Sequence, residues 1–239
     1  MPPVHPRFLR LVAAAALFIP ALLLADRPGL PAQLALGLAT AAFLFLAVRS
    51  SPVETRQVVA AILIATTGEV VLSLGWGLYT YRNALIPLYV PFGHGVFYLL
   101  AAESARQPWL QQRAKGITRG VLLAGSAIAA VSFAFFDDQW GLIWWVLAAA
   151  LLARSANQLL LSACFVYTIL LEWLGTAIGN WQWAAVVPGL GLHSANPPSG
   201  VGVLYILLDL FTVGACVWLG ASAAAPPTLA EERIPAGDA

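Results

Sequence analysis

Four ionisable side chains fall inside long apolar runs of the sequence, and these four have the greatest capacity for chemistry. They are Glu69, His94, Glu172 and Asp209. An ionisable group within a membrane-spanning helix is costly unless it faces a cavity or a partner, so such residues mark functional sites. Polar contacts that only hold helices together are the alternative role for each of them. We take the four as candidate catalytic groups that share one cavity.

Side chains suited to substrate binding cluster near these four groups, and most of them are aromatic. The candidates are Trp76, Tyr79, Tyr81, Tyr89, Tyr98, Trp173, Trp181, Trp183, Asn196 and Tyr205. Trp and Tyr also anchor helices at membrane interfaces, so part of this set is expected in an interfacial belt. The remainder can line a pocket, where a ring face attracts a cation more strongly once water is excluded.

A carboxyl group beside aromatic walls suits acid–base chemistry on a hydrophobic substrate. Low-dielectric surroundings favour the neutral form of a carboxyl, which can then act as an acid at neutral pH. Such an acid could protonate an alkene, while a second carboxylate removes a proton or activates water. Cyclisation, isomerisation or hydration of an isoprenoid dissolved in the bilayer fits this chemistry and needs no cofactor.

The composition is that of a membrane protein. Hydrophobic residues make up 60% of the 239 residues and charged residues 10%, with a mean hydropathy of +0.82, whereas about a quarter of a soluble domain is charged. The net charge is only +1 and no long basic run is present, which argues against a nucleic-acid partner. Cys164 and Cys216 both lie in apolar runs and are expected as small buried residues.

Eight apolar runs predict an all-α transmembrane bundle of about eight helices, because a helix of roughly 17 to 25 residues crosses the bilayer core and satisfies its own backbone. The runs cover about residues 8–25, 31–48, 57–80, 86–105, 118–136, 139–154, 157–179 and 201–221. Only Asp137 and Asp138 separate the fifth and sixth runs, which predicts a tight hairpin there. A bundle of seven helices is the alternative.

One membrane domain is expected over residues 1–225, followed by a short disordered cytoplasmic tail over residues 226–239, which are rich in Ala and Pro. The first apolar run follows Arg7 and Arg10 in the manner of a signal peptide. The sequence around Asp26 lacks the small-x-small cleavage pattern, so we expect a retained helix.

The distribution of Lys and Arg predicts the orientation, since cytoplasmic connections retain positive charge. With both termini in the cytoplasm, only Arg27 and Arg82 of the 12 basic residues lie outside. We therefore expect a multi-pass protein of the cell (inner) membrane, with both termini cytoplasmic and the candidate groups in the outer half of the bilayer.

Two stretches of sequence match each other and predict an internal repeat. Residues 91–100 read PFGHGVFYLL and residues 198–207 read PSGVGVLYIL. Equal orientation of the two stretches predicts a parallel duplication of a four-helix unit. Repeat 1 would cover about residues 8–105 and repeat 2 about residues 118–221.

The residues upstream of each stretch keep the same order, which supports the repeat. Glu69 precedes an aromatic pair, Tyr79 and Tyr81, and Glu172 precedes a second pair, Trp181 and Trp183. The halves differ where His94 aligns with Val201 and where Asp209 falls opposite Ala102. Chance similarity between Gly-rich and Leu-rich segments is the alternative explanation.

Residues 184–200 are rich in Pro and Gly and carry no charged side chain apart from a possible charge on His193. Such a segment cannot continue a helix. It is either a plain external loop or a lid folded into the mouth of the bundle.

Glu103 and Arg106 lie at the cytoplasmic end of their helix, where we expect a solvated interfacial pair.

Several motifs are missing from the sequence. It has no glycine-rich loop followed by Lys and Ser or Thr, which argues against nucleotide hydrolysis. It has neither HExxH nor a His-rich helix, and its three scattered His residues do not predict a metal site.

The residues Glu172, Gly175 and Gly179, followed by Trp181 and Trp183, resemble the signature of the membrane carotenoid hydratases, which are related in style to the small polytopic lycopene cyclases. The resemblance is confined to this short segment. The chain has Asn180, Trp181 and Gln182 where that family shows Phe-Gly and Tyr.

A second resemblance is to membrane-bound terpene cyclases of similar size, which use one Glu in an early helix and one Asp in the last helix. Glu69 and Asp209 occupy such places here. Either resemblance would imply Glu69 and Asp209 as the acid and its partner, with Glu172 and His94 in support.

Transport or lipid binding is the competing function. Parallel repeats, carboxylates in mid-membrane and a broken segment also occur in proton-coupled carriers. Eight helices in 239 residues is small for a carrier unless the chain forms a homodimer. A third possibility is an accessory subunit of a membrane complex. The expected partners are the lipid bilayer and a membrane lipid or isoprenoid.

Overall fold

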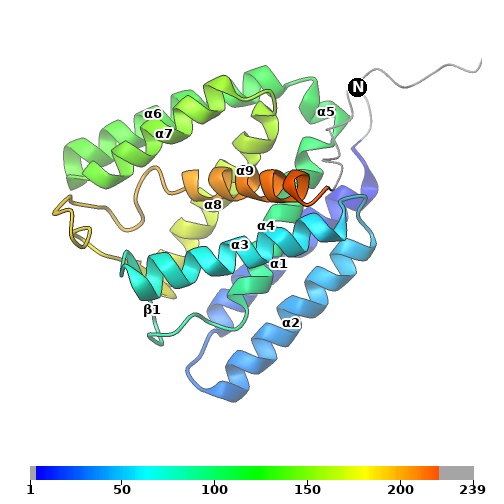
Figure 1. Cartoon of the computed structure of the whole chain (residues 1–239), viewed down its shortest axis with the longest axis horizontal. Helices are drawn as coiled ribbons and strands as arrows, with labels where there is room; N and C mark the ends of the chain where they lie inside the picture. The colour runs from blue at the N-terminus through cyan, green and yellow to red at the C-terminus, as the bar shows by residue number, and fades with distance from the viewer. Residues whose placement is uncertain (1–3, 221–239) are drawn as a thin grey trace, which may run out of the picture.

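The chain folds into an all-α bundle, shown as a computed structural model in Figure 1, and the structure describes residues 4–220. The helices are α1 (Pro6–Ala25), α2 (Leu30–Arg49), α3 (Thr55–Glu69), α4 (Val90–Ala105), α5 (Pro108–Gln111), α6 (Ala114–Phe136), α7 (Gln139–Arg154), α8 (Gln158–Ile178) and α9 (Val203–Trp218). A π-helix, η1 (Val70–Gly75), continues α3, and two short strands, β1 (Tyr79–Tyr81) and β2 (Trp181–Trp183), pair with each other. The predicted tail at residues 226–239 lies outside the described residues.

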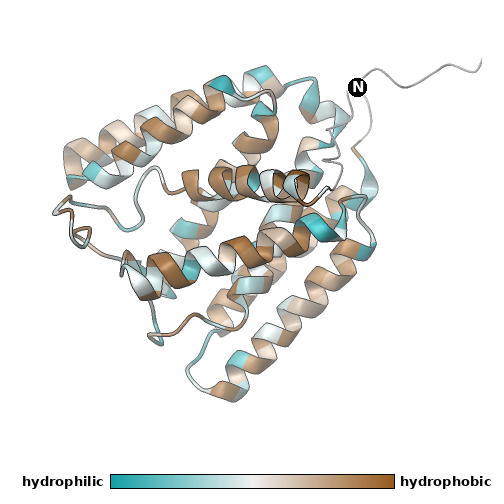
Figure 2. Ribbon diagram, viewed as in Figure 1, coloured by the Kyte–Doolittle hydropathy of each residue, from teal (hydrophilic) through white to brown (hydrophobic). Residues whose placement is uncertain are grey.

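Five helices are long and apolar enough to cross a membrane, which confirms the predicted membrane-embedded helical bundle. They are α1, α2, α3 together with η1, α6 and α8, and two shorter apolar helices, α7 and α9, accompany them. Large apolar side chains are exposed along these helices, and Figure 2 shows that the helices consist mainly of hydrophobic residues, coloured brown. Such a surface suits hydrocarbon rather than water.

Four helices form the centre of the bundle. Helix α4 packs against α3 and α8, and α9 packs against the same two helices. Helices α1 and α2 flank this centre on one side, while the α6–α7 hairpin lies on the other side (Figure 1). The central helices carry all four candidate catalytic residues.

The two ends of the bundle differ in charge. The starts of α1, α3 and α6 and the ends of α2, α4 and α7 bring most Lys and Arg residues to one end, called here the basic end. A hydrogen bond from the backbone N–H of His5 to Oε1 of Gln107 joins the start of α1 to the end of α4 there. Arg27 and Arg82 lie at the opposite end, called here the loop end.

Helix boundaries differ from the sequence prediction at the loop end. The run at 57–80 was expected to be helical throughout, but the helix ends at Gly75 because Gly77 adopts a left-handed conformation with φ of 77°. Tyr79 and Tyr81 therefore lie in a strand. The next helix begins at Val90 rather than near residue 86, with Pro91 in its first turn, where its missing N–H costs nothing.

The two halves of the chain pack alike. Strands β1 and β2 pair antiparallel with Thr80 opposite Gln182, so that Tyr79 faces Trp183 and Tyr81 faces Trp181. Helix α4 of the first half meets α8 of the second half, and α9 meets α3. A parallel duplication with a two-fold axis through the Thr80–Gln182 pair predicts this pattern.

Candidate active site

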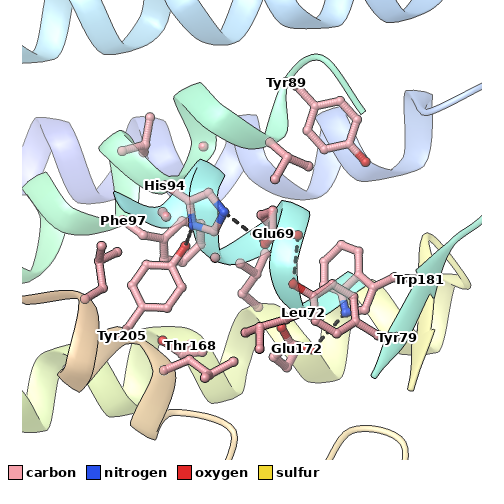
Figure 3. Close-up of a pocket in the computed structure, with 18 of the residues that line it drawn as sticks. Glu69, Leu72, Tyr79, Tyr89, His94, Phe97, Thr168, Glu172, Trp181 and Tyr205 are labelled. Atoms are coloured by element: carbon pink, nitrogen blue, oxygen red, sulfur yellow. Dashed lines mark hydrogen bonds and ion pairs between the residues drawn. The ribbon is translucent and has the colours of Figure 1, made fainter. Parts of the chain in front are cut away.

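A cavity of about 450 Å³ lies among the central helices, between α1 and the strand pair. Its lining is mainly apolar and includes the polar or aromatic side chains of Glu69, Tyr79, Tyr81, Tyr89, His94, Phe97, Thr168, Glu172, Trp181, Trp183 and Tyr205. Figure 3 shows Glu69 and Glu172 both reaching this space. Its size lies in the range of about 300 to 1,000 Å³ that is usual for small-molecule sites.

Glu69 is held by two phenols, and we call this group the first clamp: Glu69, Tyr79 and Tyr81. The hydroxyls of Tyr79 and Tyr81 both donate to Oε2 of Glu69, at 2.8 and 2.7 Å. Strand geometry explains the pair, because residues two apart on a strand point to the same face. Burial, and then the nearby Glu69 charge, raise the pKa of both phenols well above the ordinary tyrosine value, so they remain donors.

His94 links the first clamp to Tyr205. Its Nε2 lies 3.0 Å from Oε1 of Glu69, and its Nδ1 lies 2.6 Å from the hydroxyl of Tyr205. A neutral imidazole that donates from Nε2 accepts at Nδ1, so the tyrosine hydroxyl then donates to His94. Both carboxylate oxygens of Glu69 are therefore engaged.

Glu172 is held by two indoles, and we call this group the second clamp: Glu172, Trp181 and Trp183. Both indole N–H groups donate to Oε2 of Glu172, at 2.8 and 2.9 Å. Its Oε1 receives no hydrogen bond from the residues that the structure describes. Gly175 makes this clamp possible, since a Cβ atom at that position would lie 2.0 Å from the ring of Trp181.

The π-helix accounts for a difference in spacing between the clamps. Glu69 precedes its two tyrosines by 10 and 12 residues, whereas Glu172 precedes its two tryptophans by 9 and 11. A π-turn accommodates one extra residue within a helix, and such turns occur often at functional sites. The segment η1 directly follows Glu69 and absorbs this residue.

The cavity reaches the lateral surface of the bundle. Thr67, Val71 and Phe211 line it and are also exposed, the last two to 54% and 60%. Because the surface around these residues is apolar, the opening faces the hydrocarbon layer of a membrane. A hydrophobic molecule can therefore enter without crossing water.

No Lys or Arg lies among the residues that line the cavity. Arg82 is the nearest guanidinium in sequence to the first clamp, but it donates to the carbonyls of Ile178, Gly179 and Asp26. It thereby satisfies the free carbonyls at the end of α8, where a cation is favoured by the helix dipole.

The expectation that Asp209 shares the cavity is wrong. Asp209 is 5% exposed, yet it does not line the cavity, although Tyr205 one turn earlier does. Its side chain is instead buried among the packed helices outside the cavity. Side-chain direction on a helix changes by about 100° per residue, so position along the chain alone could not settle this.

Four of the ten expected substrate-binding residues also lie outside the cavity lining, namely Trp76, Tyr98, Trp173 and Asn196. Trp173 is 45% exposed on the outer surface of α8, and the indole of Trp76 donates to the carbonyl of Pro188. Both suit the interfacial belt that was the alternative reading. Asn196 accepts a hydrogen bond from the backbone of Trp183 and so fixes β2.

The loop at 184–200 is fastened to the bundle by Asp138, a residue that the sequence analysis did not select. Oδ1 of Asp138 accepts from the backbone of Gly141 and Ala195, and Oδ2 accepts from the backbone of Ser199 and from Ser132. No residue of the loop lines the cavity. The external loop, rather than the lid, fits this arrangement.

Asp26 plays a corresponding part in the first half. Its carboxylate accepts hydrogen bonds from Gln33, Tyr89 and Asn180, and the residue is fully buried like Asp138. Asp26 directly follows α1, and Asp138 is the second residue after α6. This similar place after a long apolar helix was the signal in the sequence that could have identified them.

The interpretation of Glu103 and Arg106 as a solvated pair is wrong for Glu103. This glutamate is 4% exposed and accepts a hydrogen bond from the hydroxyl of Ser51, which joins α4 to the segment between α2 and α3. Packing of α2 against α4 buries the position.

Within the described residues, no group of three His, Cys, Asp or Glu side chains could hold a metal ion. Cys164 and Cys216 are both free and buried. Comparison with known protein families, curated proteins and solved structures finds no match for this chain. The cavity is therefore the feature of the molecule that bears on its function.

Proposed function

We propose that this protein is an integral membrane enzyme that catalyses an acid–base cyclisation or isomerisation of a hydrophobic, isoprenoid-type substrate. One observation carries the proposal: a single apolar cavity, open toward lipid, holds two carboxyl groups whose hydrogen bonding differs. The concentration of basic residues at the other end of the bundle supports a cell (inner) membrane location with cytoplasmic termini and a cavity in the outer half.

Glu172 is the proposed acid. Its Oε2 is fixed by two indoles, while Oε1 has no hydrogen-bond partner among the described residues and can carry a proton. In the carboxylic acid form, Oε1 gives its proton to one carbon of a substrate double bond, whose π electrons form the new C–H bond. The neighbouring carbon becomes a cation.

The first clamp supplies the negative charge that stabilises this cation. Three donors hold the Glu69 carboxylate, so it can face a cationic intermediate without moving. The rings of Tyr79, Trp181 and Trp183 add their negative faces. Charged groups that are already oriented before the reaction lower the barrier more than groups that must first turn toward the cation.

The reaction ends when Oε1 of Glu172 removes a proton from another substrate carbon. The electrons of that C–H bond form the new double bond, and Glu172 regains its acid form. Cyclisation differs only in that a second double bond attacks the cation first. Neither reaction consumes a co-reactant, whereas hydration would require water in a mainly apolar cavity, which argues against it.

The two resemblances in the sequence bear unequally on this scheme. The carotenoid hydratase signature includes Glu172 and the two indoles, and it supports Glu172 as the acid. The pairing of Glu69 with Asp209, implied by the terpene cyclases, lacks the shared cavity that it requires.

Proton-coupled transport is the second candidate function. Buried polar side chains other than the clamps also lie in the central helices, among them Tyr98, Cys164 and Asp209, as a proton path would require. Transport would require the substrate to leave the cavity unchanged on the other side of the membrane.

Lipid analysis of cells with and without the gene tests the enzyme. Cells that make isoprenoids should contain an isomerised or cyclised lipid only when the wild-type chain is present. Glu172→Gln should abolish that product, since the amide can still accept both indole hydrogen bonds but cannot donate the proton.

Glu54→Gln is the matched control, because Glu54 is an exposed carboxylate at the start of α3 that pairs with Arg56. This variant should leave the lipid product unchanged. An isoprenoid profile that is identical with and without the gene would refute the proposed enzyme. Movement of an unaltered lipid into proteoliposomes would favour the carrier instead.

A further inference from the structure

The charges around the cavity are unbalanced. Glu69 and Glu172 both line it, and no Lys or Arg does so within the described part of the chain. His94 is the one basic side chain of the lining, and it is held between Glu69 and Tyr205. Once Glu172 has given up its proton, the cavity holds two carboxylates in an apolar wall, and this favours the entry of positive charge.

The shape of the wall favours an organic cation over a metal ion. Four rings of the lining pack in pairs, Tyr79 tilted against Trp183 and Tyr81 edge to face with Trp181, so a rigid aromatic cluster borders the cavity. Ring faces bind alkylammonium groups well when water is excluded. A small hydrated metal ion would instead lose its water for only two separate carboxylates.

The route of entry limits the cation to one that dissolves in a membrane. The exposed lining residues Val71 and Phe211 lie on the apolar lateral surface. A molecule that enters there needs an apolar body, and the carboxylates inside require a positive head. An anionic head such as a phosphate would meet two like charges and no basic partner other than His94.

We propose that the cavity is a binding site for lipophilic organic cations, meaning a single ammonium group on a hydrocarbon body. The ammonium lies between the first and second clamps, and the hydrocarbon extends toward Val71 and Phe211. This inference deepens the proposed function, on which it rests for its biological meaning, because such a cation resembles the cationic intermediate. Its test measures binding and requires no turnover.

The test uses the full chain in nanodiscs of phosphatidylcholine, with indole fluorescence as the signal. Dodecyltrimethylammonium that carries bromine at the chain end is the cationic probe, and dodecanol brominated at the same carbon is the neutral probe. Bromine quenches nearby indoles, and Trp181 and Trp183 line the cavity. The wild-type chain should show saturable quenching by the cation.

The double variant Glu69→Gln with Glu172→Gln should raise the half-saturating concentration of the cation at least ten-fold and leave that of the alcohol unchanged. Glu172→Gln alone, which keeps both indole hydrogen bonds, should raise it in the same direction and serves if the double variant does not fold. Glu54→Gln, an exposed carboxylate far from the cavity lining, should have no effect.

Equal affinity of the wild-type chain for the cation and the alcohol would overturn the proposal, as would cation binding that survives both substitutions. Anion binding at the same site, measured with brominated dodecyl sulfate, would also overturn it. If the wild-type chain does not bind the cation but still forms the lipid product, the binding proposal is overturned and the proposed enzyme is retained. Cation binding without any lipid product would remove the enzyme and leave the binding site.

Discussion

Glu69 and Glu172 occupy corresponding places in the two halves, yet the first accepts from two phenols and an imidazole and the second from two indoles. A phenol or an imidazole both donates and accepts, so protons can be exchanged along the first clamp. An indole only donates. Glu172 lines the cavity and can therefore exchange a proton only through Oε1, which has no hydrogen-bond partner among the described residues.

This difference shows how two halves with a similar backbone arrangement can form an asymmetric site. The backbone frame is shared, since both carboxylates precede a strand and both strands belong to one sheet. Side-chain identity and one extra residue in η1 separate the two halves. The acid, Glu172, and its counter-charge, Glu69, can therefore both come from the same kind of backbone arrangement.

The largest expected effect is a difference in the rate of product formation between Glu172→Gln and Glu69→Gln. Glu172→Gln should lower the rate of product formation by about 100-fold or more, because a general acid contributes roughly 10² to 10⁴. Glu69→Gln should lower it less, by about 10-fold, since Tyr79, Tyr81 and His94 stay in place. Product formation in isolated membranes, normalised to folded protein, measures both.

Equal losses in the two carboxyl variants would show that the clamps are chemically equivalent. A larger loss in Glu69→Gln than in Glu172→Gln would reverse the assignment of acid and counter-charge.

A second prediction concerns Gly175, which leaves room for the ring of Trp181 in the second clamp. Gly175→Ala should destabilise the protein by about 1 to 3 kcal/mol, the usual range for overpacking, because the new methyl group meets the ring of Trp181. Thermal unfolding in detergent, followed by circular dichroism, measures the loss.

Gly120→Ala in α6 is the control for this substitution, since no atom lies within 4 Å of a Cβ atom placed there. Alanine at that helical position should be neutral or stabilise slightly. If Gly175→Ala is as well tolerated as Gly120→Ala, the packing of the indole on the helix is looser than described.

The smallest expected effect belongs to Asp209, which neither clamp contains. Asp209→Asn should change the rate of product formation by less than about three-fold, because general acids act within hydrogen-bond reach of the substrate. The same measurement in membranes applies. A loss as great as that of Glu172→Gln would show that Asp209 supplies the proton after all and would favour the carrier-like proton path.

The sequence predicted the helical bundle and the residues of both clamps, and the reasons are physical. Apolar length and the cost of an intramembrane charge depend on local composition alone, so Glu69 and Glu172 stood out. The order of aromatics after each carboxylate also survived into the structure. Tyr79 and Tyr81 were recognised, although the helix expected over residues 57–80 ends at Gly75 and both tyrosines lie in β1.

The direction of side chains around the helix axis could not be predicted. Asp209 and Tyr98 lie on helices that contribute to the cavity, yet both point elsewhere. The anchoring roles of Asp26 and Asp138 depend on contacts over long distances in sequence. A single sequence without packing information contains little of either signal.

The sheet between the halves limits how the molecule can move. Thr80 and Gln182 lie at the centre of a hydrogen-bonded ladder, and Arg82 adds two further bonds across the same junction, to the carbonyls of Gly179 and Ile178. Rocking of one half against the other would therefore pivot at this end and open a gap only at the basic end. A carrier that alternates between the two faces must break the ladder in each cycle, whereas a catalyst supplied sideways from the bilayer can keep it closed.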